Sequence, residues 1–158
     1  MSNIEKLKTY LKSINNLEVV NNTSDLKRLS RDFYDYSPIL KEELKGCIAD
    51  VVVRPHSIES IIAVVSKCWD LSIPLTIRGG GTGNYGQCVP LFKGVVMHMN
   101  HFNKIEEFYP DTGFIKVQSG CLMSDLNKEL ARNGRELRLL PSTWRTATIG
   151  GFISGGSG

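Results

Sequence analysis

Two clusters of glycine are the residues of this chain best suited to bind a ligand. The chain has 15 glycines in 158 residues, and they gather between Gly79 and Gly86 and again between Gly150 and Gly158. Successive glycines can turn their backbone N–H groups toward one point, and their missing Cβ atoms let an anion approach. A phosphate or pyrophosphate is therefore the natural ligand of such a loop.

The first glycine segment reads R-G-G-G-T-G-N-Y-G-Q over residues 78–87. It follows a predicted strand, and strand ends are where α/β sheets bind ligands. Residues 81–86 fit the pattern G-x-G-x-x-G, but a Rossmann site needs a helix directly after the loop, and Val89-Pro90 and Lys93-Gly94 interrupt the chain before another strand. A Walker A loop is excluded because no Gly-Lys-Ser/Thr follows. Alone, this segment fits a turn without a ligand as well as a phosphate site.

The second glycine segment begins at Thr148-Ile149-Gly150-Gly151, after Pro141-Ser142-Thr143, and offers hydroxyl groups together with backbone amides that we expect to be free. Two such segments in one small domain favour a ligand with a long phosphate chain. No metal site is predicted. The cysteines are single and widely spaced, which is typical of buried, unreactive thiols: Cys47, Cys68, Cys88 and Cys121.

The elements that must position these segments are predicted to form a parallel layer followed by a mainly antiparallel one. Strands are predicted over residues 50–55, 74–78 and 94–99, and a hairpin over 104–118. Helices are predicted over residues 3–14 with Ser2 as N-cap, from Ser24 toward residue 34, from Ser57 as N-cap to Leu71, and from Ser124 as N-cap to Asn133. The apolar face of the third helix is interpreted as Ile58, Ile61, Ile62, Val65, Cys68 and Trp69. The fold class is therefore α+β, with residues 1–45 as an N-terminal helical extension and 46–158 as the domain proper.

Composition narrows the class of protein further. Hydrophobic residues make up 41% and charged residues 22% of the chain, which excludes a disordered tail, a fibrous repeat and a membrane bundle. The net charge is +3, and the basic residues are scattered, so no nucleic-acid partner is indicated. The apolar stretches fall far short of the roughly 20 residues that span a bilayer, and no secretory signal is present. We expect a cytoplasmic protein, and because the chain stops inside the second glycine segment we expect it to be the N-terminal piece of a longer one.

Four segments in this order resemble one family. They are the first glycine segment, the G-V-V-M-H-M strand at 94–99, V-Q-S-G-C at 117–121, and P-S-T followed by A-T-I-G-G over 141–151. Together they resemble the FAD-binding domain of the vanillyl-alcohol oxidase and p-cresol methylhydroxylase (PCMH) type, from about Asp50 onward. The chain is most similar to the FAD-linked dehydrogenases of glycolate or D-lactate type.

The resemblance implies a set of FAD-binding residues. In such a domain the amides from Gly79 to Asn84 would surround the pyrophosphate, Thr82 would add a hydroxyl group, and Gln87 would lie near the flavin. A second contact segment would be Pro141, Ser142 and Thr143, and a glycine-rich strand from Thr148 to Ser154 would line the isoalloxazine ring and ribityl chain. The full set is Arg78, Gly79, Gly80, Gly81, Thr82, Gly83, Asn84, Gln87, Pro141, Ser142, Thr143, Thr148, Ile149, Gly150, Gly151 and Ser154.

The resemblance also implies an activity: oxidation of a small hydroxylated donor, a 2-hydroxy acid or an alcohol, with FAD as hydride acceptor. Relatives that tether flavin covalently carry a histidine in the first loop, where this chain has Thr82, so FAD is expected to be noncovalent. His56, His98 and His101 are interpreted as a surface, a core and a turn residue. The catalytic residues stay unknown, because the family's substrate groups come mostly from a C-terminal domain outside this chain.

Two alternatives stay open. One is a non-redox module that uses the same glycine segments to bind another nucleotide or phosphate. The other keeps the fold and uses NADPH as donor, as in the cell-wall precursor reductases of the same family. A fragment of this kind would leave strand edges and apolar surface open, so we also expect self-association.

Overall fold

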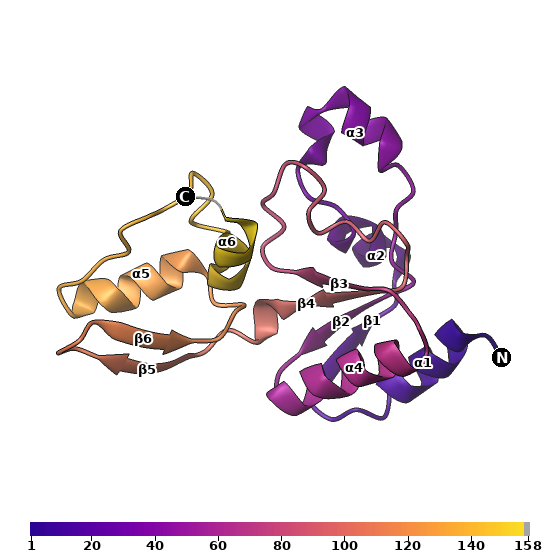
Figure 1. Cartoon of the computed structure of the whole chain (residues 1–158), viewed down its shortest axis with the longest axis horizontal. Helices are drawn as coiled ribbons and strands as arrows, with labels where there is room; N and C mark the ends of the chain where they lie inside the picture. Colours follow the sequence, from indigo (N-terminus) through magenta and orange to yellow (C-terminus); the bar gives the residue numbers. More distant parts are fainter. Residues whose placement is uncertain (157–158) are drawn as a thin grey trace.

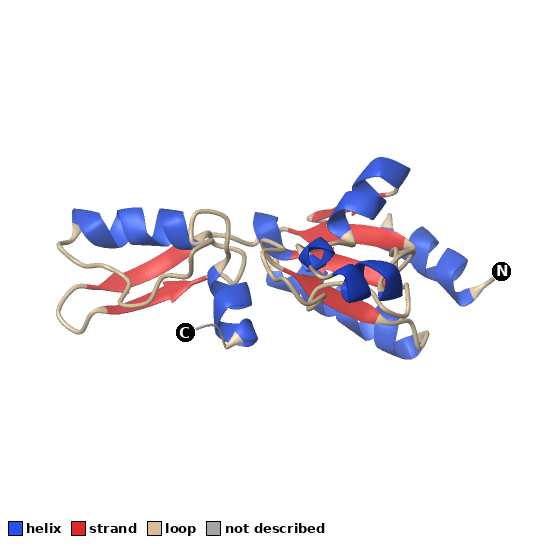
Figure 2. Cartoon of the chain, turned by 90° about the horizontal axis from the view of Figure 1, so that it is seen from above, coloured by secondary structure: helices blue, strands red, loops and turns tan. Residues whose placement is uncertain are grey.

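The computed structural model describes residues 1–156 and shows two lobes side by side (Figure 1). Residues of the first lobe form a four-stranded sheet with helices on both faces. The second lobe is a two-stranded hairpin covered by one helix, and a short helix, α6, lies between the lobes in both views (Figure 2). The predicted α+β class, with a small parallel layer followed by an antiparallel one, is confirmed.

The sheet of the first lobe has the strand order β1-β2-β4-β3. Strands β2 (Val51–Pro55), β4 (Val95–His98) and β3 (Leu75–Arg78) are parallel. These are the three predicted strands. Strand β1 (Leu17–Val20) was not predicted; it pairs antiparallel with β2, with Leu17 opposite Pro55 and Val20 opposite Val52. The N-terminal residues are therefore not purely helical. Strand β1 was not predicted because a run of four residues between asparagines is too short to show a hydrophobic period of its own.

Side chains of the strands alternate between two cores. Val51, Val53, Val95 and Met97 pack with helices α1 (Asn3–Leu11) and α4 (Ile58–Asp70) on one face. Val52 and Val96 pack with helix α2 (Thr23–Leu29) on the other. This period of two explains why β2 and β4 are apolar throughout, since both faces of a covered parallel strand are buried.

Helix α4 begins at the predicted N-cap, Ser57, which forms a reciprocal capping box with Ser60. Its predicted apolar face is partly wrong. The sheet covers Ser60, Val64 and Cys68, whereas Ile58, Ile62, Val65 and Trp69 are exposed, Trp69 by 86%. The apolar arc of this helix is wider than the strip that one sheet can cover, so half of it faces outward.

Three short helices complete the first lobe. They are η1 (Tyr34–Tyr36), α3 (Pro38–Glu43) with Ser37 as N-cap, and η2 (Met99–His101), which directly follows β4. Helix η2 leads the chain into the second lobe.

The second lobe contains strands β5 (Ile105–Tyr109) and β6 (Phe114–Val117), the predicted antiparallel hairpin, and helix α5 (Met123–Arg132). Leu126 and Leu130 of α5 pack on the hairpin through a core that includes Cys121. The predicted N-cap of α5, Ser124, is wrong. The helix begins after Leu122, and the Ser124 hydroxyl instead donates to the carbonyl of Arg145 at 3.3 Å.

The expectation of a glycine-rich strand from Thr148 to Ser154 is also wrong, because residues Ile149–Gly155 form helix α6, which begins after Thr148. Thr148 is the N-cap, and its Oγ1 accepts from the Gly151 amide at 3.2 Å. Gly156 ends the helix in the left-handed region, with φ at 60°. None of the helices within residues 1–156 is long and apolar enough to cross a membrane.

Candidate functional site

A cavity of about 370 Å³ lies where the two glycine segments meet. This volume is within the range of small-molecule sites, roughly 300–1,000 Å³. The loop after β3 supplies one wall, and α6 with the preceding loop supplies the other. Segments from both lobes therefore form one site.

Most of the predicted site residues line this cavity: Gly79, Gly80, Gly81, Thr82, Gly83, Gln87, Pro141, Thr143, Thr148, Gly150, Gly151 and Ser154. Four others do not: Arg78, Asn84, Ser142 and Ile149. The lining also includes residues that the sequence analysis did not select, among them Asp32, Cys88, Met99, Ser119 and Phe152.

Glycines of the first segment allow it to touch the second. A Cβ atom on Gly79 would lie 2.2 Å from Thr148 Oγ1, and one on Gly80 would lie 2.1 Å from the carbonyl oxygen of Thr146. Gly81 has a φ of +66°, in the left-handed region that glycine adopts without strain. The missing side chains thus bring the two walls together, besides leaving space in the cavity.

The amides of the two glycine segments differ. Within residues 1–156, none of the backbone N–H groups from Gly79 to Asn84 donates a hydrogen bond to the protein. In the second segment Ile149 donates to the carbonyl of Cys121, Gly150 to that of Ser119, both at 2.9 Å, and Gly151 to Thr148 Oγ1. The expectation of free amides there is wrong, because α6 and its contacts use them. An acceptor in the cavity would find its backbone donors in the first segment.

Arg78 supports the first segment from beneath. It is only 7% exposed, and its Nη1 donates to the carbonyl of Arg31 and lies 3.1 Å from Cys88 Sγ. A Cβ atom on Gly81 would come within 2.0 Å of its Nη2. Arg78 therefore fixes the loop, and its guanidinium is close enough to add positive charge behind it.

Asp32 is the main residue that the sequence analysis missed. Its Oδ1 accepts from the Tyr34 amide at 2.9 Å, and the next residue, Phe33, donates its amide to the Gly83 carbonyl at 2.8 Å. The buried Oδ2 has no hydrogen-bond partner among the described residues. Burial raises the pKa of Asp32, against the opposing effects of the Tyr34, Gly86 and Gln87 amides and the Arg78 charge. No motif marks this residue; only folding brings it under the loop.

Other buried titratable groups of the first lobe are held neutral. Burial, with the Arg78 charge as the next cause, lowers the pKa of His98 to about 3. Burial raises the pKa of the Cys88 thiol, and it raises that of Cys68 to about 11. Both thiols are therefore protonated at neutral pH, as expected of unreactive cysteines.

The cavity fits a cofactor with a phosphate chain. Asp32 is the only carboxylate that lines the cavity, and no lysine, arginine or histidine lines it in the described residues, so the donors available to an anion are backbone amides and hydroxyl groups such as Thr82 and Thr143. Free amides in a glycine loop form a concave anion site. FAD, whose pyrophosphate such loops bind, is thus consistent with the residues present.

Known proteins resemble this chain over the same region. Residues 49–158 match the family described as FAD binding domain. D-lactate dehydrogenase of Anaerostipes hadrus is 32% identical over 109 residues, which are 69% of this chain and 23% of that protein. Glycolate oxidase subunit GlcD of Escherichia coli K12 is 31% identical over 108 residues, 68% of this chain and 22% of that protein. The chain thus spans less than a quarter of the length of these curated relatives.

Solved structures share the fold. Alkyldihydroxyacetonephosphate synthase superimposes with a TM-score of 0.77 over 96% of this chain and 28% of its own, at 19% identity. The p-cresol methylhydroxylase structure with substrate bound gives 0.69 over 98% of this chain and 28% of its own, at 17% identity. The fold is therefore that of a PCMH-type FAD-binding domain. With the family match covering most of the chain and the two glycine segments forming one cavity, this chain belongs to the FAD binding domain family, whose cofactor is FAD.

Proposed function

We propose that this chain binds the FAD pyrophosphate through the amides from Gly79 to Asn84. The observation that carries the proposal is that these amides have no partner within the described residues and belong to a loop that lines the cavity. Thr82 adds a hydroxyl group at the same wall. Arg78 supports the loop and adds positive charge on the side away from the cavity. Asn84 contributes its backbone N–H group rather than its side chain.

The second glycine segment would contact the flavin and ribityl chain through van der Waals contacts rather than through hydrogen bonds from free backbone amides. Thr148, Gly150, Gly151 and Ser154 form one wall of the cavity, with Pro141 and Thr143 beside them. Ile149 and Ser142 lie outside the lining and would support this wall.

We infer that the flavin is bound without a covalent bond. Thr82 stands where tethering relatives carry histidine, and no histidine lines the cavity in the described residues. We expect acid precipitation of the flavin-loaded full-length protein to release all of its yellow colour to the supernatant. Colour that stays in the pellet would show a covalent link.

The whole protein is proposed to be an oxidoreductase for a small hydroxylated donor, with a 2-hydroxy acid as the leading candidate. D-lactate dehydrogenase and glycolate oxidase are the names of similar proteins, and FAD would supply the two-electron acceptor. The substrate groups and the catalytic base are expected outside this chain. A cytoplasmic location and self-association of the 158-residue chain remain predictions.

The test is flavin binding by two proteins. We expect the full-length protein to carry FAD, visible as flavin absorbance, and residues 1–158 alone to bind it weakly or not at all, because the chain spans less than a quarter of the length of its curated relatives. A full-length protein that binds another nucleotide and no flavin would support the non-redox alternative. Saturable micromolar FAD binding by the isolated chain would show that the cofactor site is already complete here.

A further inference from the structure

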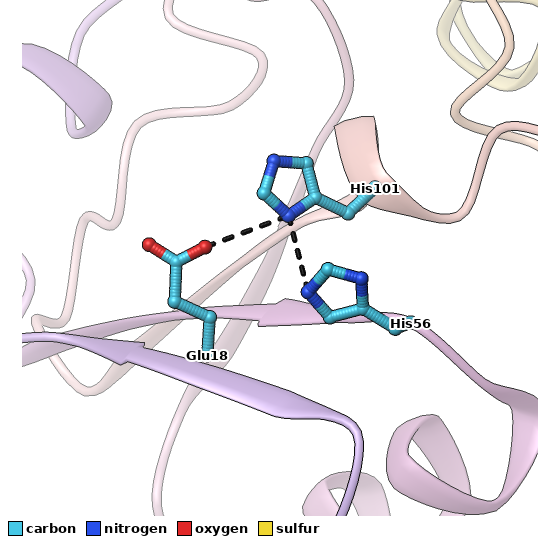
Figure 3. Close-up of side chains that lie close together, drawn as sticks. All are labelled: Glu18, His56 and His101. Atoms are coloured by element: carbon cyan, nitrogen blue, oxygen red, sulfur yellow. Dashed lines mark hydrogen bonds and ion pairs between the residues drawn. The ribbon is translucent and has the colours of Figure 1, made fainter.

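Three polar side chains from distant segments converge outside the cofactor cavity. Glu18 lies on β1, His56 directly follows β2, and His101 ends η2 (Figure 3). His101 Nδ1 lies 3.2 Å from His56 Nε2 and 3.5 Å from Glu18 Oε2, and one ligand atom from each residue falls within 4.8 Å of the other two. The three atoms therefore lie close enough together to be shared by one ion.

The backbone holds these residues in place. Glu18 is opposite Arg54 in the β1–β2 ladder, and the His56 amide donates to the carbonyl of Asn16 at 2.9 Å. Arg54 Nη1 donates to Glu18 Oε1 at 2.5 Å, which orients the carboxylate and leaves Oε2 toward His101. An outer partner of this kind commonly fixes a metal-ligating group.

We propose that Glu18, His56 and His101 form a Zn²⁺ site. Imidazole nitrogens with a carboxylate oxygen are a ligand set of zinc, at bond lengths of about 2.0–2.2 Å. In a tetrahedron with such bonds, ligand atoms lie roughly 3.3 Å apart, close to the two shorter separations here. Magnesium and calcium prefer oxygen ligands alone. The half-exposed position leaves the fourth coordination site to water.

The hydrogen bonding of the cluster agrees with this assignment. His101 Nδ1 and His56 Nε2 lie at hydrogen-bond distance, 3.2 Å apart, and ring nitrogens of this kind are common metal ligands. In the metal-free protein, one ring nitrogen donates a hydrogen bond to the other. Zinc would replace that shared proton.

A metal here would join β1, β2 and η2. Met99, the first residue of η2, lines the cofactor cavity, so this turn is common to both sites. The proposal is independent of the proposed function, because no cluster residue lines the cavity. No metal was expected from the sequence, because ligands from three separate segments show no motif spacing.

The test is Zn²⁺ titration of the untagged 158-residue chain against a chromophoric chelator. We expect one bound equivalent. Glu18→Gln, His56→Gln and His101→Gln should each weaken affinity by at least roughly tenfold. Glu43→Gln, a carboxylate remote from the cluster, and Cys47→Ser, which removes the half-exposed thiol, should leave it unchanged. No saturable binding, or equal affinity in all variants, would overturn the proposal.

Cobalt(II) substitution of the unmutated chain gives a second readout that does not depend on how the variants fold. Nitrogen and oxygen ligands should produce visible ligand-field bands without the near-ultraviolet charge-transfer band of a cobalt thiolate. A strong charge-transfer band would assign the metal to cysteine and refute the site.

Discussion

The two glycine segments share a composition and differ in backbone structure. The first is an open loop in which Gly81 and Gly86 have φ values of +66° and +79°, and its backbone N–H groups from Gly79 to Asn84 donate no hydrogen bond to the described residues. The second is a helix with Thr148 as N-cap, and its first amides are used. Glycine composition alone therefore does not distinguish a ligand-binding loop from a closely packed helix. The neighbouring residues decide whether the missing side chains make room for a ligand, a turn or a close contact.

The largest effect is expected from a Cβ atom in the first segment. Gly81→Val would push into the Arg78 guanidinium, 2.0 Å from its Nη2, and we expect loss of flavin from the full-length protein, measured as the ratio of flavin to protein. Gly134→Val is a matched control, because Gly134 also has a φ of +66° and a Cβ atom there would meet no atom of residues 1–156 within 4 Å. Both variants carry a similar backbone strain, about 1–2 kcal/mol.

Gly134→Val should therefore keep its flavin at somewhat lower stability. If Gly81→Val retains flavin at the wild-type ratio, the first segment does not bind the pyrophosphate.

A smaller effect is expected in the second segment, and only at one of two adjacent glycines. A Cβ atom on Gly150 would lie 2.7 Å from the carbonyl oxygen of Ser119, so Gly150→Ala should lower the free energy of unfolding by about 1–3 kcal/mol. On Gly151 the nearest atom would be Thr148 Oγ1 at 3.1 Å. Alanine favours a helix over glycine by up to about 1 kcal/mol, so Gly151→Ala should stay within about that amount of wild type.

Urea denaturation of the 158-residue chain measures both variants. Equal losses would mean that α6 itself, rather than its contact with Ser119, requires glycine.

The smallest effect expected is a change in the pH dependence of stability at Asp32. This residue lies outside the first segment, next to Phe33, whose amide donates to the Gly83 carbonyl. Because burial raises its pKa, the folded protein holds this proton more tightly than the unfolded chain does. This contribution to the free energy of unfolding is fully present at a pH below the ordinary pKa of aspartate. It is lost as the pH rises through the raised pKa of the folded protein. Asp32→Asn keeps an oxygen for the Tyr34 amide and cannot titrate there.

Across that pH window, wild type should lose stability relative to Asp32→Asn, as urea denaturation at a series of pH values would show. Parallel curves for the two proteins would mean that Asp32 is not desolvated under the loop.

Sequence alone could predict the parts of the fold that depend on local patterns. Runs such as Val51–Val53 and the cap at Ser57 mark β2 and α4, and the first segment follows a recognisable strand. Helix α6 could not be predicted, because glycine disfavours helix by about 1 kcal/mol per residue, and the hydrogen bonds from Ile149 to Cys121 and from Gly150 to Ser119 that offset this are tertiary. Asp32 and the cluster of Glu18, His56 and His101 depend on segments that only the sheet brings together.

Strand β1 has a practical consequence for anyone who wishes to isolate this domain. The family match begins at residue 49, yet β1 covers the outer edge of β2, and Leu7 and Leu11 of α1 are fully buried against the sheet. A polypeptide trimmed to the matched region would present the N–H and C=O groups of Val51–Pro55 as an open edge beside an apolar hollow, the usual starting point of edge-to-edge aggregation. The unit that can be expressed is therefore longer, at its N-terminal side, than the unit that is recognised.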